Sequence, residues 1–199
     1  MFWNKVAPLY DLFENVYNGK VYTGTGKKVA DMIEPSDEAL ECACGTGAIS
    51  IYIAQKCKKL IATDFSSGML RRVAKKCGKY DNVTIKKVDI MNIKCKDNRF
   101  DKVVAGNVIH LLPEPEKALR ELERVAKPGG MIIIPTYINM SKGASKAAVK
   151  LITLLGADFK RQFDLDSYKR FFEKMGYTEA KYYVVNGRMP CAIAVITKK

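Results

Sequence analysis

The stretch Ala39–Gly47, which reads A-L-E-C-A-C-G-T-G, decides the fold that we expect for this chain. It combines a short run of strand length with a carboxylate, Glu41, and a turn that contains Gly45 and Gly47. Glycines in such a turn let the backbone reach positive φ angles and come close to a ligand. Taken alone, the turn also suits a dinucleotide site or a plain tight connection from strand to helix.

Apolar runs of strand length alternate with segments of helical period after this turn. Such alternation is typical of β-α-β units, in which consecutive strands are parallel. Helical spacing follows Ser66-Ser67, and it recurs from Glu114 to Ala126, where we expect Pro128-Gly129-Gly130 to stop the helix. The five strands expected to be parallel are Ala39–Ala43, Leu60–Thr63, Val83–Val88, Lys102–Ala105 and Met131–Pro135.

The C-terminal segment departs from this alternation. We expect Asp166-Ser167 to open a helix that ends at Gly176, and two β-rich runs follow it, Glu179–Val185 and Ala192–Thr197. Asn186-Gly187 between these runs favours a hairpin, because both residues tolerate positive φ. The sequence therefore predicts an α/β fold with a seven-stranded, mostly parallel sheet and a C-terminal antiparallel hairpin.

Length and composition fit one globular domain, since the chain has 199 residues, 48% hydrophobic and 28% charged. We expect residues 1–199 to form a single domain, with residues 1–36 as an N-terminal cap segment. Residues 139–162 are a candidate substrate lid, because they follow the fifth predicted strand, where this fold often inserts an element that covers the substrate. Their apolar stripe and lysine-bearing face would also suit an ordinary surface helix. No signal peptide or long apolar run is visible, and six cysteines without a disulfide framework favour the reducing cytoplasm.

The chain is basic, with a net charge of +13. Such a charge suits a polyanionic partner or an anionic lipid surface. The lysines come in pairs spread along the chain, however, so we favour ordinary solvated lysines. A nucleic-acid partner is not expected because no recognition motif is present, whereas a peripheral contact with a membrane surface stays open. We expect a monomer or a homodimer.

Asp64 ends the second predicted strand, about 20 residues after the glycine turn, where a carboxylate can accept hydrogen bonds from a ribose diol. This favours an adenosine ligand. Nicotinamide sites normally have a third glycine, and Ser50 stands in that place here. S-adenosylmethionine lacks a pyrophosphate, and its ammonium group could use Glu41 and nearby carbonyls. A nicotinamide-dependent oxidoreductase and a nucleic-acid-binding or RNA-modifying protein remain as alternatives.

With these motifs the chain resembles the class I S-adenosylmethionine-dependent methyltransferases, in particular the ubiquinone/menaquinone biosynthesis group. The resemblance runs from about Tyr10 to Gly130. It implies a Rossmann-like three-layer sandwich and methyl transfer from S-adenosylmethionine to a small, apolar or aromatic acceptor. It rests on the glycine turn and on the ordered motifs Y-D-L-F, I-A-T-D-F-S-S-G-M-L, K-K-V-D-I, F-D-K-V-V-A-G-N-V-I-H-L-L-P-E and A-L-R-E-L-E-R-V-A-K-P-G-G.

The resemblance also implies the residues of a cofactor site. Those expected around the methionine part are Glu41, Gly45 and Gly47, with Asn107 and Val108 near the sulfonium. Those expected around the adenosine part are Asp64 on the ribose, Phe65 and Met69 beside it, Asp89 on the adenine amino group and Ile90 on its ring. Ala43 stands where the family usually has glycine, so a methyl group must be accommodated there. Tyr22 belongs to the N-terminal segment that folds over the cofactor.

His110, the only histidine of the chain, falls just past the fourth predicted strand, at the edge where a parallel sheet places ligands. It is a candidate general base, and it could equally fill space beside the cofactor. Tyr10 is a second candidate catalytic residue. No metal site is expected, because Cys42-x-Cys44 lacks a second pair of cysteine or histidine ligands.

Overall fold

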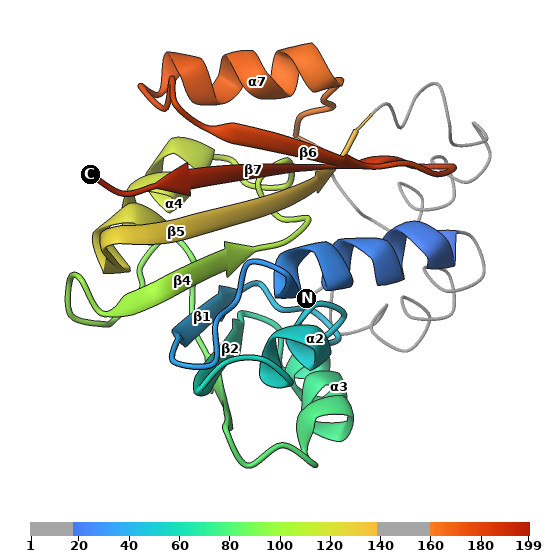
Figure 1. The fold of residues 1–199 in the computed structure, drawn as a ribbon, viewed down its shortest axis with the longest axis vertical. Coiled ribbons are helices and arrows are strands. Elements are labelled where there is room, and N and C mark those ends of the chain that lie inside the picture. Colours follow the sequence, from blue (N-terminus) through green and yellow to red (C-terminus); the bar gives the residue numbers. More distant parts are fainter. Residues whose placement is uncertain (1–17, 139–159) are drawn as a thin grey trace.

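The computed structural model describes residues 18–138 and 160–199, which form three layers (Figure 1). Within these residues the middle layer is a seven-stranded sheet in the order β3-β2-β1-β4-β5-β7-β6. The strands from β1 to β5 pair in parallel, whereas β7 is antiparallel to both β5 and β6. The strand bounds are β1 Glu38–Cys42, β2 Lys59–Asp64, β3 Val83–Lys87, β4 Phe100–Ala105, β5 Ala126–Tyr137, β6 Lys181–Val185 and β7 Cys191–Thr197.

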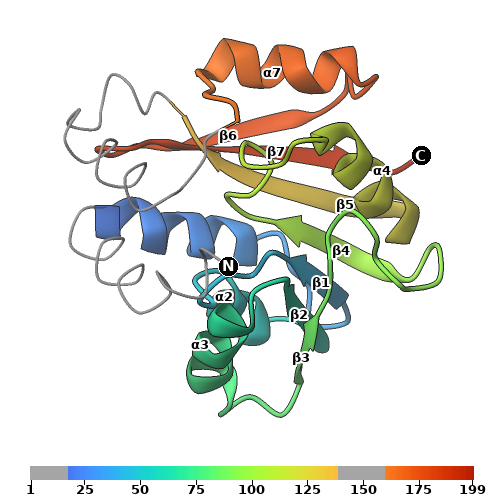
Figure 2. The same ribbon diagram turned by 180° about the vertical axis from the view of Figure 1, so that it is seen from behind.

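Helices cover both faces of the sheet (Figures 1 and 2). A helix over residues 18–30, α2 (Ser50–Ala54) and α3 (Ser67–Cys77) share one buried cluster with the sheet. On the other face, α4 (Pro115–Val125) and α7 (Leu165–Lys174) contribute to a second cluster. The predicted three-layer architecture is therefore confirmed.

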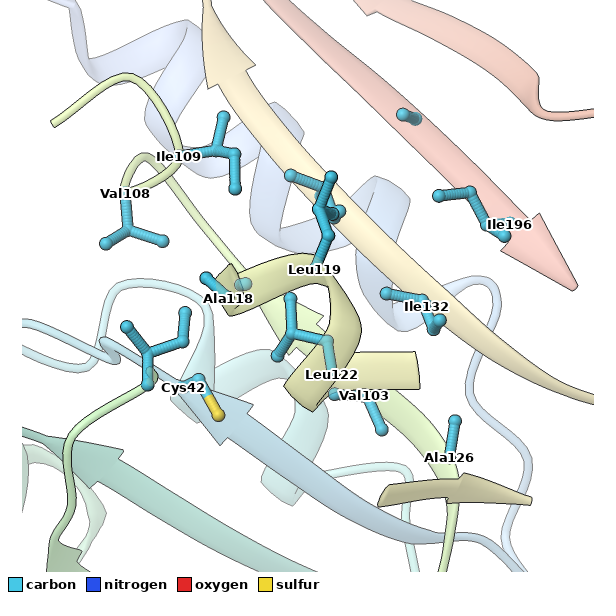
Figure 3. Close-up of a cluster of buried hydrophobic side chains, with 14 of the residues drawn as sticks. Cys42, Val103, Val108, Ile109, Ala118, Leu119, Leu122, Ala126, Ile132 and Ile196 are labelled. Carbon is cyan, nitrogen blue, oxygen red and sulfur yellow. The ribbon is translucent and has the colours of Figure 1, made fainter. Parts of the chain in front are cut away.

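The second cluster shows how helical periodicity becomes packing. Ala118, Leu119 and Leu122 recur at helical spacing on α4, and each is 0 or 1% exposed. They pack with Val103 of β4 and Ile132 of β5, as Figure 3 shows. Each buried leucine side chain contributes about 1.5–3 kcal/mol of transfer free energy. The packing of α4 against β4 and β5 therefore fixes both ends of the loop that connects β4 to α4.

Two predicted helix ends differ from the structure. The helix α7 begins earlier than predicted, because Asp164 caps it and exchanges hydrogen bonds with Ser167 in a capping box. At the other position, Pro128-Gly129-Gly130 does not stop α4. That helix ends at Val125, and the chain enters β5 directly at Ala126, which pairs with Phe100.

The remaining predictions of element order agree with the structure. Ser66 caps α3, since its side chain accepts a hydrogen bond from the Met69 backbone N–H. The strands β6 and β7 form the predicted antiparallel hairpin, with Val185 opposite Cys191 and residues 186–190 as the connection. The candidate lid lies outside the described residues except for its last three, and so does the cap segment before residue 18.

Candidate active site

A cavity of about 360 Å³ lies where the chain leaves the carboxyl ends of β1, β2, β3 and β4. Its volume is at the lower end of the range of about 300–1,000 Å³ that is typical of small-molecule sites. The order of connections reverses between β1 and β4, and parallel sheets bind ligands at such a point. The lining comes from residues 43–46, 64–65, 69, 88–91, 106–108 and 111–112.

Most of the cofactor residues expected from the sequence meet at this cavity. Three of the twelve do not line it, namely Glu41, Gly47 and Tyr22. Leu111 and Leu112 were missed, although they directly follow the candidate base in the same motif. The other lining residues that sequence reasoning did not predict are Cys44, Thr46, Val88, Met91 and Gly106. The expected residues that do line the cavity are Ala43, Gly45, Asp64, Phe65, Met69, Asp89, Ile90, Asn107 and Val108.

Ala43 starts the turn in the left-handed backbone region, at φ +52°. A residue with a Cβ atom pays about 1–2 kcal/mol for that conformation, which explains why glycine is favoured at this position. The left-handed conformation of Ala43 also ends the regular alternation of side chains between the two faces of the sheet. As a result, Cys42 and Cys44 lie in different buried clusters, and both are free thiols in the core.

The two glycines of the turn have different surroundings, although both have positive φ, +55° at Gly45 and +87° at Gly47. A Cβ atom on Gly45 would meet no atom within 4 Å, and this residue lines the cavity. A Cβ atom on Gly47 would lie 2.9 Å from Cγ2 of Val73 on α3. Gly45 thus leaves room for a ligand, whereas Gly47 lets α3 pack closely against the turn.

Asp64 ties the turns after β1 and β2 together. Its Oδ2 accepts a hydrogen bond from the Gly45 N–H at 2.9 Å, and its Oδ1 accepts one from the Ser66 N–H at 2.7 Å. Burial raises the pKa of the Asp64 carboxyl, and the backbone hydrogen bonds partly oppose that rise. Each carboxylate oxygen has two lone pairs, so both retain capacity for a ligand hydroxyl.

Glu41 lies beneath the turn rather than in the cavity wall, with 1% of its surface exposed. Burial raises the pKa of this carboxyl to about 8, although the Ser50 hydroxyl, which donates a hydrogen bond to it, lowers the pKa. The nearby Asp64 charge raises it further. Ser50 therefore has a structural partner in Glu41, at the position where a dinucleotide site would have its third glycine.

Asp89 and Asn107 each fix a segment of the cavity wall. The Asp89 Oδ1 accepts a hydrogen bond from the Met91 N–H at 2.9 Å. Asn107 has φ +52°, which asparagine tolerates, and its Oδ1 accepts a hydrogen bond from the Tyr137 N–H at 3.1 Å. Its own N–H donates to the Pro135 carbonyl at 2.7 Å, so the chain end of β4 is held against β5.

Of the two candidate catalytic residues, only His110 is among the described residues. His110 is buried, with 4% of its surface exposed, and it is not part of the cavity lining. Burial lowers the pKa of its imidazole to about 4, so the ring is neutral at pH 7. Its role as a general base stays a prediction. Tyr10 lies outside the described residues.

Tyr22, on the helix over residues 18–30, connects to the turn through Lys76 of α3. The Lys76 ammonium group lies 3.5 Å from the Tyr22 hydroxyl and donates a hydrogen bond to the Thr46 hydroxyl at 3.2 Å. Thr46 lines the cavity, whereas Tyr22 does not. Tyr22 therefore supports the turn from the side of the N-terminal helix.

The charge of the cavity wall is opposite to that of the protein. Two carboxylates, Asp64 and Asp89, line the cavity, and no lysine or arginine among the described residues does so. The apolar part of the wall includes Phe65, Met69 and Ile90. In the same two described ranges, no group of three or more histidine, cysteine, aspartate or glutamate side chains could hold a metal ion.

Comparisons with known proteins agree with this arrangement. A family model described as a methyltransferase domain matches residues 40–134. The chain is 27% identical to a demethylmenaquinone methyltransferase of Desulfitobacterium hafniense (94% of this chain, 88% of the relative). It is also 27% identical to the enzyme of that name from Staphylococcus haemolyticus (90% and 85%).

Solved structures share the fold at lower identity. An S-adenosylmethionine-dependent methyltransferase of Thermotoga maritima superposes with a TM-score of 0.74 at 19% identity, covering 100% of this chain and 99% of that one. Magnesium protoporphyrin IX methyltransferase from Synechocystis, solved with bound S-adenosylhomocysteine, gives 0.68 at 18% identity, with coverage of 89% and 84%.

The fold, the glycine turn and the matching family model point to one class: residues 40–134 match a methyltransferase domain, and the chain is similar to class I S-adenosylmethionine-dependent methyltransferases. Among the structures that share this fold, one is named a putative S-adenosylmethionine-dependent methyltransferase and another holds S-adenosylhomocysteine. Within this class it resembles the ubiquinone/menaquinone biosynthesis methyltransferases, as the sequence motifs indicated. In the parts of the chain that the structure describes, no helix is long and apolar enough to cross a membrane.

Proposed function

We propose that the cavity at the carboxyl ends of β1 to β4 binds S-adenosylmethionine, and that the methyl group passes to a small, apolar aromatic acceptor. The observation that carries this proposal is the acidic wall. Asp64 and Asp89 line the cavity without a described lysine or arginine, in a chain with a net charge of +13. The negative potential of this wall would repel a pyrophosphate, whereas it favours a ligand such as S-adenosylmethionine, which has no phosphate and carries a net positive charge.

The shape of the site also fits the cofactor. Gly45 leaves open space where a side chain would otherwise enter the cavity. The Asp64 carboxylate, already oriented by two backbone N–H groups, can accept hydrogen bonds from the ribose hydroxyls. Phe65, Met69 and Ile90 offer apolar surface for the adenine ring, and Asp89 can accept from its amino group.

The cofactor supplies an activated methyl group, so this chain's residues mainly align the reactants. Such alignment is worth about 7–11 kcal/mol in well-oriented systems. The turn and Asp64 form one hydrogen-bonded unit, and Asn107 fixes the next strand end to β5. Leu111 and Leu112 add apolar surface that excludes water. We infer that rigid positioning, rather than a strong base, is the principal contribution of these residues.

We propose a reduced quinone as the acceptor class. This rests on the relatives named demethylmenaquinone methyltransferase and on the apolar lining of the cavity. In an electron-rich hydroquinone ring, a carbon can form the new bond to the methyl group while the bond from sulfur to that methyl breaks, and the ring proton then leaves. Turnover of a reduced 2-prenyl-1,4-naphthoquinone with labelled S-adenosylmethionine tests this proposal. Transfer only to thiols or amines would contradict it.

Ligand-dependent unfolding tests the cofactor site. S-adenosylhomocysteine at about 100 times its dissociation constant should stabilise the protein by about 2.7 kcal/mol, or roughly 5–10 °C in Tm. NADH should not. Asp64→Asn should lower the affinity for S-adenosylhomocysteine by about tenfold or more, since an amide replaces one acceptor oxygen. Asp81→Asn, on the surface, is the matched control. A Tm shift with NADH alone would refute the assignment.

We further propose a peripheral contact with anionic lipid. Residues 56–96 contain 12 lysines and arginines but only three acidic residues. Lys86 and Lys87 end the edge strand β3, directly before lining residues 88–91, and Lys87 lies 5.6 Å from the ring centroid of Phe65, which is 52% exposed. Co-sedimentation with phosphatidylglycerol vesicles, against phosphatidylcholine vesicles, tests this contact, and equal recovery on both would exclude it.

We place the protein in the cytoplasm, because all six cysteines are free and five of them are buried in the packed core. Such thiols persist in a reducing compartment. Fractionation of cells that produce the tagged protein tests this location. Recovery from an oxidising compartment would contradict it.

A further inference from the structure

The loop between β4 and α4 carries two apolar residues of the cavity wall that sequence reasoning missed. Leu111 and Leu112 of this loop line the cavity, and Ile109 packs in the core beside α4 (Figure 3). Within the loop, the Leu111 N–H donates to the Val108 carbonyl at 2.8 Å. Partly buried carbonyl groups of such a loop need donors from elsewhere in the chain.

Arg161 supplies two of these donors from a distant position in the sequence. Its backbone N–H donates to the His110 carbonyl at 3.1 Å. Its guanidinium Nη1 donates to the Leu112 carbonyl at 3.0 Å, and Nη2 lies 3.9 Å from Oε1 of Glu116 in the first turn of α4. Arg161 itself is not part of the lining.

The segment that carries Arg161 is anchored in the core. Phe163, two residues further on, is 8% exposed and packs against Tyr168 with ring centroids 5.3 Å apart. Tyr168 belongs to α7 and is completely buried. Arg161 therefore connects a fixed part of the core to the loop that shapes the cavity.

We propose that Arg161 is a positioning residue that sets the affinity of the cavity for its adenosine ligand by holding Leu111 and Leu112 in place. The inference rests on the proposed assignment of this cavity to S-adenosylmethionine. Arginine suits the role because its planar fork directs separate N–H groups to the Leu112 carbonyl and toward Glu116. A lysine provides one flexible ammonium group instead, so it can replace only part of this arrangement.

Calorimetric titration with S-adenosylhomocysteine tests the proposal on the full chain. Arg161→Ala retains the backbone bond to His110 but loses the guanidinium contacts, and its dissociation constant should rise by about tenfold. Arg161→Lys should recover part of that loss. Where the alanine variant does not fold, Arg161→Gln supplies the measurement, and its dissociation constant should rise more than that of Arg161→Lys and by up to about tenfold.

Arg124→Ala is the matched control, because it separates affinity from general stability. Arg124 likewise donates its guanidinium N–H groups to loop carbonyls, those of Ile93 and Cys95, but these residues do not line the cavity. It should lower Tm without changing the dissociation constant. An unchanged dissociation constant in the Arg161 variants, or an equal rise in Arg124→Ala, would overturn the proposal while leaving the methyltransferase function intact. Absence of binding to the wild type would instead refute the cofactor site.

Discussion

Replacing Gly47 by alanine tests whether this glycine serves packing rather than ligand binding. The left-handed backbone at φ +87° costs a residue with a Cβ about 1–2 kcal/mol. The added methyl group would lie 2.9 Å from Cγ2 of Val73, and such overpacking costs about 1–3 kcal/mol more. We expect Gly47→Ala to lower the free energy of unfolding by about 2–5 kcal/mol, or roughly 4–20 °C in Tm.

A double-mutant cycle with Val73→Ala isolates the steric part of this effect. That second substitution alone is destabilising, since Val73 is 0% exposed, but it removes the Cγ2 atom that the new methyl group would strike. The double variant should therefore be more stable than the sum of the two single effects by about 1–2 kcal/mol, measured by urea unfolding.

Gly45→Ala is the control for the cycle, because its Cβ atom would enter open space. It should cost only the backbone term of about 1–2 kcal/mol and show no coupling to Val73→Ala. Its effect on S-adenosylhomocysteine affinity should exceed that of Gly47→Ala, since only Gly45 lines the cavity. Additive effects of Gly47→Ala and Val73→Ala would show that the close contact with α3 is not the reason why position 47 requires glycine.

The remaining predictions concern a buried carboxyl group and a helix cap. The folded-state pKa of Glu41, about 8, is raised above its ordinary value of 4.5, so its stabilising contribution is complete below pH 4.5 and is lost as the pH rises through 8. The pKa of His110 is lowered to about 4, so its contribution to the free energy of unfolding increases as the pH rises from 4 to 6.5 and would mask the effect of Glu41 there. Urea unfolding should therefore be measured between pH 6.5 and 8. In this range the free energy of unfolding should fall by up to about 1.4 kcal/mol per pH unit, and Glu41→Gln should abolish this fall. An equal dependence on pH in the wild type and in Glu41→Gln would contradict the raised pKa of the Glu41 carboxyl. Ser66→Ala should lower Tm by about 2–4 °C through loss of the α3 cap, and Ser67→Ala, at the next position, should change it much less.

The sequence could predict the sheet because its signals are local. Each parallel strand is a short apolar run, and Asn186-Gly187 marks the hairpin through its own backbone preferences. The start of α7 was wrong because Asp164, Asp166 and Ser167 are all good caps, and only the capping box between Asp164 and Ser167 decides among them. The predicted stop at Pro128-Gly129-Gly130 was wrong because β5 already begins at Ala126, and these three residues lie within β5 between the β4 pairs of Ala126 and Met131, where Gly129 and Gly130 exchange backbone hydrogen bonds with Lys198.

The site shows the same division between local and distant causes. The turn and Asp64 could be recognised because their chemistry follows from residue type and spacing. The different roles of Gly45 and Gly47 could not, because they depend on Val73 of α3. Burial likewise separates His110 from the cavity wall, although its place after the fourth strand was predicted correctly. Arg161 gave no local signal, since its partners precede it by about 50 positions.

The acidic character of the cavity is a property of placement rather than of composition. Residues 56–96, which span β2, α3 and β3, are the most basic part of the site's surroundings, with 12 lysines and arginines against Asp64, Asp81 and Asp89. Two of these three carboxylates nevertheless line the cavity, and none of the 12 basic residues does. Long basic side chains keep their charged ends in water, where salt screens them. The Asp64 carboxylate instead lies buried in the cavity wall, where water weakens its interactions with a ligand less, whereas Asp89 lines the exposed part of the cavity. A positively charged cofactor can therefore bind within a protein whose exterior attracts anions.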